Sequence, residues 1–179
     1  MSTTKVSVTT TINVVRKFFI VFFYITKDKS KIIKSQLAQI NVAKMKGVNI
    51  DDPIMKEFVD NLDRINSIAE QSDGFVWRLT DESNNATSFN PYQNEQIIIN
   101  ISVWRDIDSL KQFVYNSDHA SFIRRRKEWF TQFGKAFFCM WWIPEGQMPT
   151  LDNATERLDH LQANGPSEYA FDFRTIFEQ

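Results

Sequence analysis

The sequence predicts an α+β fold, a ferredoxin-like antiparallel sheet that carries its helices on one face. Two observations lead to this prediction. The expected elements run in the order β-α-β-β-α-α-β-α-β, and the first part of that order is the split βαβ unit of ferredoxin-like domains. A chain of 179 residues also suits a single domain, which we place at residues 35–179, with an N-terminal extension over residues 1–34.

The first half of the domain supplies three strands and one helix. Residues 35–45 alternate and are rich in strand formers. Pro53 suits the first position of a helix whose apolar residues recur at steps of three and four, and Gly74 ends it. Residues 74–79 and 96–104 are the next two strands, and the polar stretch between them predicts a long loop.

The second half adds three helices and two strands. A helix over 106–117 has Asp106 as its cap, and a second helix over 119–134 is expected to end at Gly134. The apolar run 135–144 predicts a buried strand ended by Pro144. Thr150 caps a helix that ends at Gly165, and residues 169–177 form the last predicted strand.

The N-terminal extension carries a short apolar run, Phe18 to Ile25, between basic residues. Eight residues are too few to cross a bilayer, which takes about 20, so we expect no stable membrane span. A basic start and a short apolar stretch loosely fit a secretory signal, but no small-residue cleavage site follows. We expect a cytoplasmic protein, with a targeting or disordered role for residues 1–34 left open beside a β-rich extension.

Composition limits the possible partners and cofactors. The formal net charge of −1 speaks against general nucleic-acid binding, which needs a basic excess. One cysteine, Cys139, excludes an intrachain disulfide, and two histidines with one cysteine speak against a zinc site. The 16 Phe and 5 Trp indicate an aromatic core or interface.

The predicted strands have one apolar face and one face that mixes polar and aromatic groups. Such a mixture is typical of a ligand cavity or of the lumen of a dimeric barrel, although a wet outer face with scattered tryptophans is the alternative. The cavity could lie between sheet and helices or in the lumen. Its expected lining residues are Asn41, Arg78, Asn100, Trp104 and Trp141.

The stretch SDHASFIRRRKEWF (117–130) holds the two candidate catalytic residues, His119 and Arg126. Imidazole can act as an acid or a base near neutral pH, but a histidine at a helix start is also a common packing residue. Helical spacing separates the three arginines, which leaves Arg126 about two turns from His119. A solvated basic face paired with Glu128 is the alternative interpretation of these arginines.

Several longer stretches together resemble family 3291 of the domains of unknown function. They are LAQINVAKMK, DGFVWRL, ISVWRDIDSLKQFVY, DHASFIRRRKEWF, CMWWIPEGQMPTLDNATERLDHLQANGPS and YAFDF. The resemblance covers about residues 36–176 and implies membership of the dimeric α+β barrel superfamily, which includes antibiotic-biosynthesis-type monooxygenases. It implies a homodimer in which two ferredoxin-like subunits pair their sheets, and it transfers no catalytic residue.

Two functions follow as hypotheses. The first is a monooxygenase-like enzyme or small-molecule-binding barrel, which would desolvate and orient its substrate beside a group that accepts a proton. The second is a non-catalytic binding or self-assembly module. We expect no cofactor, or haem as the lesser alternative, with His119 or His160 as its axial ligand.

Overall fold

The computed structural model describes residues 34–178. Its sheet contains β1 (Ser35–Met45), β2 (Phe75–Arg78), β3 (Ile97–Trp104), β4 (Phe130–Thr131) and β5 (Phe138–Pro144). The extension predicted for residues 1–34 lies, apart from Lys34, outside the described residues.

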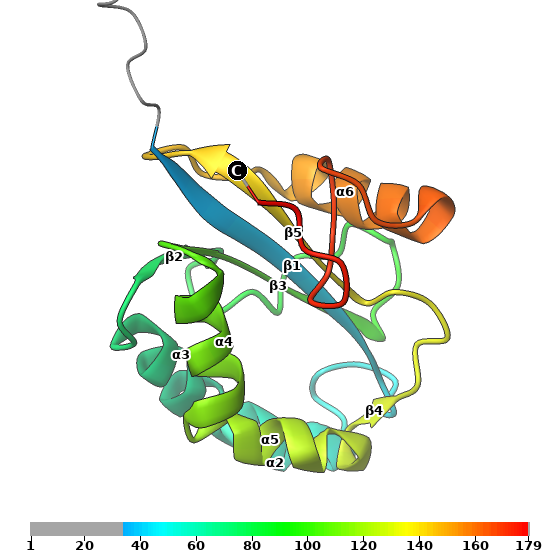
Figure 1. Ribbon diagram of the computed structural model, residues 1–179. Helices are drawn as coiled ribbons and strands as arrows, with labels where there is room; N and C mark the ends of the chain where they lie inside the picture. Colours follow the sequence, from blue (N-terminus) through cyan, green and yellow to red (C-terminus); the bar gives the residue numbers. More distant parts are fainter. Residues whose placement is uncertain (1–33, 179) are drawn as a thin grey trace, which may run out of the picture. The chain divides into compact units, whose positions relative to one another are not determined.

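Strand β1 is the centre of the sheet (Figure 1). It pairs antiparallel with β3 on one side, and on the other side with β5 along most of its length and with β4 at its end. Strand β2 pairs antiparallel with β3 at the far edge. The order β2-β3-β1-β5 of the four main strands is the ferredoxin-like arrangement, so the predicted α+β sheet is confirmed.

The helical elements are η1 (Pro53–Met55), α2 (Lys56–Asp60), α3 (Leu62–Glu70), α4 (Ile107–Asn116), α5 (His119–Arg125), η2 (Arg126–Glu128) and α6 (Leu151–Asn164). Both predicted caps are confirmed. The carboxylate of Asp106 accepts a hydrogen bond from the backbone of Ser109 at 2.7 Å, and the hydroxyl of Thr150 accepts one from Asn153 at 3.2 Å.

The helices of the ferredoxin-like unit lie on one face of the sheet, as predicted (Figure 1). Helix α6, which was expected on that same face, lies on the other, because its apolar residues pack with the apolar side chains there. Alternation along β1 separates the two faces. Leu37 packs with Ala69 of α3 and Leu110 of α4, whereas its neighbour Ala38 packs with Leu158 of α6. We call these the α4 face and the α6 face of the sheet.

Two predicted elements differ from the structure near their ends. The helix expected over 119–134 ends by Glu128, because the Trp129 side chain turns inward with only 3% of its surface exposed. The next two residues then leave the helical path and pair as β4 with Lys44 and Met45. The helix expected after Pro53 is interrupted at Asn61, where the side-chain amide bonds the carbonyl of Glu57 at 2.8 Å.

The strand predicted over 169–177 does not form. Only Phe171 bridges to β5, through two backbone hydrogen bonds with Met140. The carboxylate of Asp172 then accepts hydrogen bonds from the backbone of Arg174 and Thr175, which turns the chain. Local side-chain bonding therefore overrides the strand propensity of the phenylalanines here.

Candidate functional site

A row of polar side chains crosses the α4 face of the sheet. Gln39 of β1 is buried, with 3% of its surface exposed, and stands opposite Ser102 of β3. Its Nε2 donates to Asn100 Oδ1 at 2.8 Å and to Ser102 Oγ at 2.7 Å. The indole Nε1 of Trp104 donates to the same Ser102 hydroxyl at 2.9 Å. The strands therefore hold an amide network where a sheet normally packs apolar side chains on its helices.

One atom of this network is without a partner. The Oε1 of Gln39 is buried and accepts no hydrogen bond from any described residue. Buried polar atoms are nearly always bonded, because an unpaired one costs about 1–3 kcal/mol. An unpaired carbonyl oxygen inside an aromatic core is therefore a position that a ligand or a water molecule would satisfy.

An aromatic column connects the network to His119. The Trp104 ring stacks on Phe113 of α4 at a centroid distance of 5.1 Å, and Phe113 stacks on the imidazole of His119 at 4.5 Å. The turn between α4 and α5 fixes the histidine, because the Ser117 hydroxyl accepts a hydrogen bond from its backbone nitrogen at 3.1 Å. Rings from β3, α4 and α5 thus form one continuous surface.

Burial favours the uncharged form of the His119 imidazole. Burial lowers its pKa below the ordinary value of 6.5, and the backbone carbonyl of Val114 acts in the opposite, smaller sense. Its Nδ1 is buried and has no hydrogen-bond partner among the described residues. A neutral imidazole with a free ring nitrogen can accept a proton from a bound molecule.

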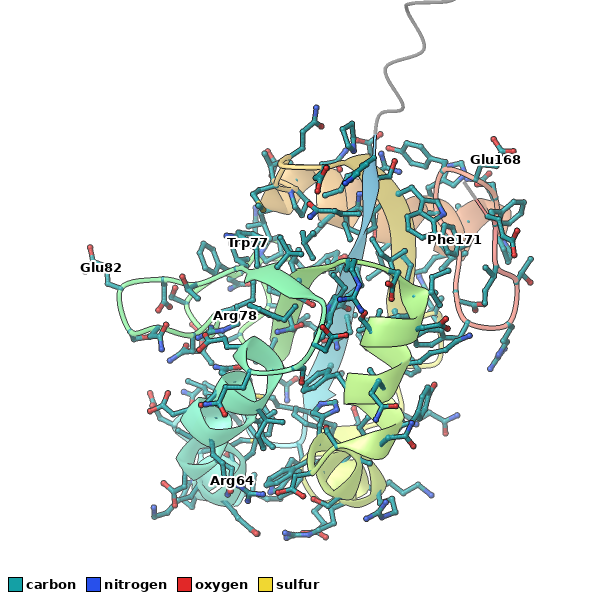
Figure 2. The ribbon with its side chains drawn as sticks, turned by 60° about the vertical axis from the view of Figure 1, so that its left-hand side comes forward. Arg64, Trp77, Arg78, Glu82, Glu168 and Phe171 are labelled. Atoms are coloured by element: carbon teal, nitrogen blue, oxygen red, sulfur yellow. The ribbon has the colours of Figure 1, made fainter. Side chains whose placement is uncertain are left out.

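The structure brings four of the predicted lining residues to the α4 face. Asn41 and Asn100 face each other across β1 and β3, and both are half-buried, which makes this the more open end of the polar row. Trp104 lies at the other end of the row and is buried. Arg78 stands opposite Ser102 on β2, beneath α3 (Figure 2).

The guanidinium of Arg78 is not free for a ligand. Its side chain is 4% exposed, and Nε and Nη2 lie 2.8 and 2.7 Å from Glu70 Oε1. Nη2 also donates to Asn84 Oδ1 at 3.0 Å, in the loop after β2. Because Nε and Nη2 are bonded within the chain and Glu70 balances the charge, Arg78 supports the edge of the site and does not supply an unpaired positive charge.

Trp141 and Arg126 lie outside this cluster. Trp141 points to the α6 face, where the guanidinium of Arg157 lies over its ring at 5.2 Å. Arg126 is exposed on η2 and lies over the Phe137 ring at 5.2 Å. The structure therefore does not bring either residue to His119.

Sequence reasoning missed Gln39, Ser102 and Phe113 as members of the cluster. A signal for the first two was present, since Gln39 shares its side of β1 with Asn41 and Ser102 shares its side of β3 with Asn100 and Trp104. Phe113 belonged to the predicted apolar stripe of its helix, and nothing in the stripe distinguishes a ring that stacks on a histidine from an ordinary core residue.

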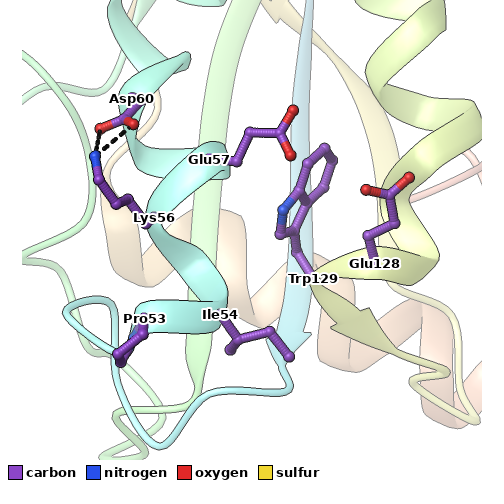
Figure 3. A pocket seen from close by; sticks show the side chains of 7 residues that line it. All are labelled: Pro53, Ile54, Lys56, Glu57, Asp60, Glu128 and Trp129. Atoms are coloured by element: carbon purple, nitrogen blue, oxygen red, sulfur yellow. Dashed lines mark hydrogen bonds and ion pairs between the residues drawn. The ribbon is translucent and has the colours of Figure 1, made fainter.

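A surface hollow of about 420 Å³ opens elsewhere, between α2 and the end of η2 (Figure 3). It is lined by Pro53, Ile54, Lys56, Glu57, Asp60, Glu128 and Trp129. Its charged groups already pair within the chain: Lys56 with Asp60 at 2.6 Å, and both Glu57 and Glu128 with Arg125 at 2.7 and 2.6 Å. We therefore place the candidate site in the network and not in this hollow.

His160, one of the two predicted axial ligands of a haem, has no free ring nitrogen. Both of its ring nitrogens face other side chains, Nδ1 at 3.2 Å from Asn164 Nδ2 and Nε2 at 3.4 Å from Ser167 Oγ. The ring of His119, the other predicted ligand, is stacked on Phe113. Among residues 34–178, no group of three or more His, Cys, Asp or Glu side chains is arranged to hold a metal ion.

Within residues 34–178, no helix is both long and apolar enough to cross the hydrocarbon core of a bilayer.

Solved structures that are similar to this chain include the following three. The NE2512 protein of unknown function from Nitrosomonas europaea has a TM-score of 0.43 and 11% identity, covering 66% of this chain and 98% of its own. SnoaB, a cofactor-independent oxygenase from Streptomyces nogalater, has a TM-score of 0.42 and 14% identity, and the match covers 65% of this chain and 97% of SnoaB. The ActVA-Orf6 monooxygenase of Streptomyces coelicolor, solved with nanaomycin D, has a TM-score of 0.39 and 7% identity, and the match covers 65% of this chain and 95% of that protein. At these TM-scores the likeness carries no argument about function.

No curated protein matches the chain. A family model does match, over residues 36–179, which is most of the sequence and all of the described sheet except Ser35. The predicted resemblance is thereby confirmed, and the chain belongs to the family called Domain of unknown function (DUF3291).

Proposed function

We propose that this domain binds a small organic molecule between the α4 face of its sheet and helices α4 and α5. The observation that carries the proposal is the buried Oε1 of Gln39, left unpaired inside a network that already bonds Asn100 and Ser102. A second unpaired atom, Nδ1 of His119, belongs to the same assembly through the ring column. Aromatic walls with a few polar groups are the usual lining of such sites.

A titration followed by two-dimensional ¹H–¹⁵N NMR tests this location, because side-chain amides give resolved signals. We expect aromatic fragments to shift the amide signals of Gln39, Asn41 and Asn100. The amide of Asn164, at the exposed end of α6, is the matched control and should stay unchanged. Binders that shift only the backbone signals of Ile54, Glu57 and Trp129 would place the site in the surface hollow and overturn the proposal.

A monooxygenase-like reaction is the activity that this arrangement supports best. A phenol bound beside His119 would pass its hydroxyl proton to the free Nδ1, which leaves an electron-rich phenolate in a desolvated site. The phenolate reduces O₂: one oxygen atom enters the ring, which becomes a quinone, and the other leaves as water together with two hydrogens from the substrate. No electron donor besides the substrate is needed.

Oxygen consumption in the presence of a bound phenol tests the reaction separately from binding. His119→Phe keeps the ring stack on Phe113 and removes the proton acceptor, so we expect binding within about threefold of the parent and loss of turnover. Equal oxygen consumption by the variant would remove His119 from the mechanism. Binding without any oxygen consumption by the parent protein would leave the non-catalytic binding module.

A homodimer belongs to the same proposal. It is supported by apolar side chains that remain exposed on α4 and on the C-terminal segment that it contacts: Tyr115 at 56%, whose ring contacts Phe173, and Ile176 at 39%. Helix α6 already covers the opposite sheet face, so we place the contact at this surface. Light scattering after size exclusion should give twice the mass of one chain, and Tyr115→Lys should restore the monomer. A cytoplasmic location stays a proposal from the sequence.

A further inference from the structure

The charges around the candidate site select the kind of molecule it can take. On the α4 face, strands β1, β3 and β5 present only uncharged side chains, among them Gln39, Asn100 and Met140. Strand β2 contributes one charge, Arg78, whose guanidinium is already neutralised by Glu70. The inward side of α4 consists of Leu110, Phe113 and their apolar neighbours.

Helix α5, which carries His119, and the following turn η2 also present no free positive charge to the site. Their three successive arginines, Arg124 to Arg126, are all exposed. Arg125 is engaged by Glu57 and Glu128, and Arg126 lies over Phe137, on the surface and not over the network. Among the described residues, no arginine or lysine is therefore both buried and free at this site.

We infer that the site accepts an uncharged aromatic ligand and rejects the corresponding anion, an inference that rests on the binding function proposed above. Moving a carboxylate out of water is costly unless a cation or several donors replace its hydration. The site offers hydrogen-bonding amides and stacked rings but no available cation, which suits a hydroxyl group on a planar ring.

The preference of the site for uncharged ligands also sets the order of events in the proposed reaction. The substrate enters as a neutral phenol and loses its proton only inside, to His119. A substrate that arrives already ionised would be excluded, and charge on the ring would be created only where water has been removed.

Three probes with one ring system and different charges test the inference at pH 7: 2-naphthol, 2-naphthoate and 2-naphthylmethylammonium. We expect the side-chain amides of Asn41 and Asn100 to report binding of 2-naphthol, with 2-naphthoate bound at least tenfold more weakly. The cationic probe should also bind at least tenfold more weakly, because the carboxylate of Glu70 at the edge of the site is already paired with Arg78.

A substitution that adds a charge tests whether the charge of the ligand, and not its hydrophobicity alone, decides which probe binds. We call this dependence on charge the charge rule. Asn41 is half-buried at the open end of the row, so Asn41→Lys can place an ammonium beside a bound anion. We expect this variant to bind 2-naphthoate at least tenfold more tightly than the parent does, whereas Asn164→Lys on α6 should change nothing.

The outcomes distinguish a failure of the charge rule from a failure of the proposed binding function. If 2-naphthoate binds the parent as tightly as 2-naphthol and shifts the same amides, the charge rule is wrong and the binding function stands. If Asn41→Lys gives no gain for 2-naphthoate, the charge rule is also wrong. If no probe shifts the amides of Gln39, Asn41 or Asn100, the binding function fails together with the rule.

Discussion

The two faces of the sheet are built differently, although the same strands form both. On the α6 face, residues Ala38, Ile40, Ile101 and Trp141 pack with Leu158 and its neighbours into an apolar core. On the α4 face the alternate positions of the same strands hold an amide network. Polar groups weaken a core unless all of them are hydrogen-bonded. The α6 face is therefore the one that stabilises the domain, whereas the α4 face is the one that can bind a ligand.

Unpaired polar atoms occur on both faces, and their surroundings differ. On the α6 face, Nε1 of Trp141 and the hydroxyl of Tyr92 are buried without hydrogen bonds. Burial raises the pKa of Tyr92 and of the nearby Cys139 thiol to about 12, so both stay protonated. No amide network surrounds them, whereas the unpaired oxygen of Gln39 belongs to one with a half-buried end.

The largest expected effect is on the α6 face. Trp141 is fully buried there, so Trp141→Ala should lower the free energy of unfolding by about 3–5 kcal/mol through lost contacts and a cavity. Urea denaturation followed by circular dichroism measures it. Phe137→Ala, at an aromatic residue that is 40% exposed, is the control and should cost far less. Equal losses for the two variants would contradict the assignment of the stabilising core.

The second effect tests how α4 is fixed to the sheet. Gly74, just before β2, has a φ of +79°, and a Cβ there would lie 2.2 Å from Ser109 Oγ on α4. Gly74→Ala should therefore destabilise the domain by about 1–3 kcal/mol through strain and the clash. Gly146→Ala has a similar φ of +83° and open space around it, so it isolates the strain alone. If both variants lose the same stability, the contact with Ser109 is unimportant.

A smaller effect is expected within the network itself. Gln39→Met keeps the length of the side chain and removes the unpaired oxygen together with two hydrogen bonds. Loss of the two hydrogen bonds lowers the free energy of unfolding, whereas removal of the buried unpaired oxygen raises it. Because Ser102 Oγ also keeps its hydrogen bond from Trp104, we expect the free energy of unfolding to change by less than about 1 kcal/mol. Fragment binding, by contrast, should be lost. A loss of several kcal/mol in the same urea assay would show that the network serves stability and not binding.

The difference between the faces was only partly predictable from the sequence. Alternation assigned Asn100 and Trp104 to one side of a strand and Ile99 and Ile101 to the other, which the pairing confirms. Alternation does not state which side the helices cover. The mixed side, expected to line a cavity or the lumen of a dimer, lies beneath α3 and α4, because α6 takes the apolar side.

The column of rings was beyond prediction for another reason. It depends on the angle at which α5 leaves α4, and that angle is set by local bonds such as the one from the backbone of His119 to the Ser117 hydroxyl. Helical periodicity within α4 or α5 contains no information about the turn between them. The same limit explains β4, where the burial of Trp129 decides the path of the chain after η2.

The smallest expected effect is the pH dependence of stability that His119 contributes. Burial lowers the pKa of its imidazole in the folded protein below 6.5, so below that pH the unfolded chain binds a proton that the folded chain does not. The contribution of His119 is therefore fully present above pH 6.5 and declines as the pH falls toward its folded pKa. Urea midpoints at pH 7.5 and 5.5 should differ less for His119→Phe than for the parent, because the variant cannot take up this proton. An identical difference for both proteins would mean that the imidazole is solvated and free to ionise, and the α4 face would then lose the neutral proton acceptor that distinguishes it from the α6 face.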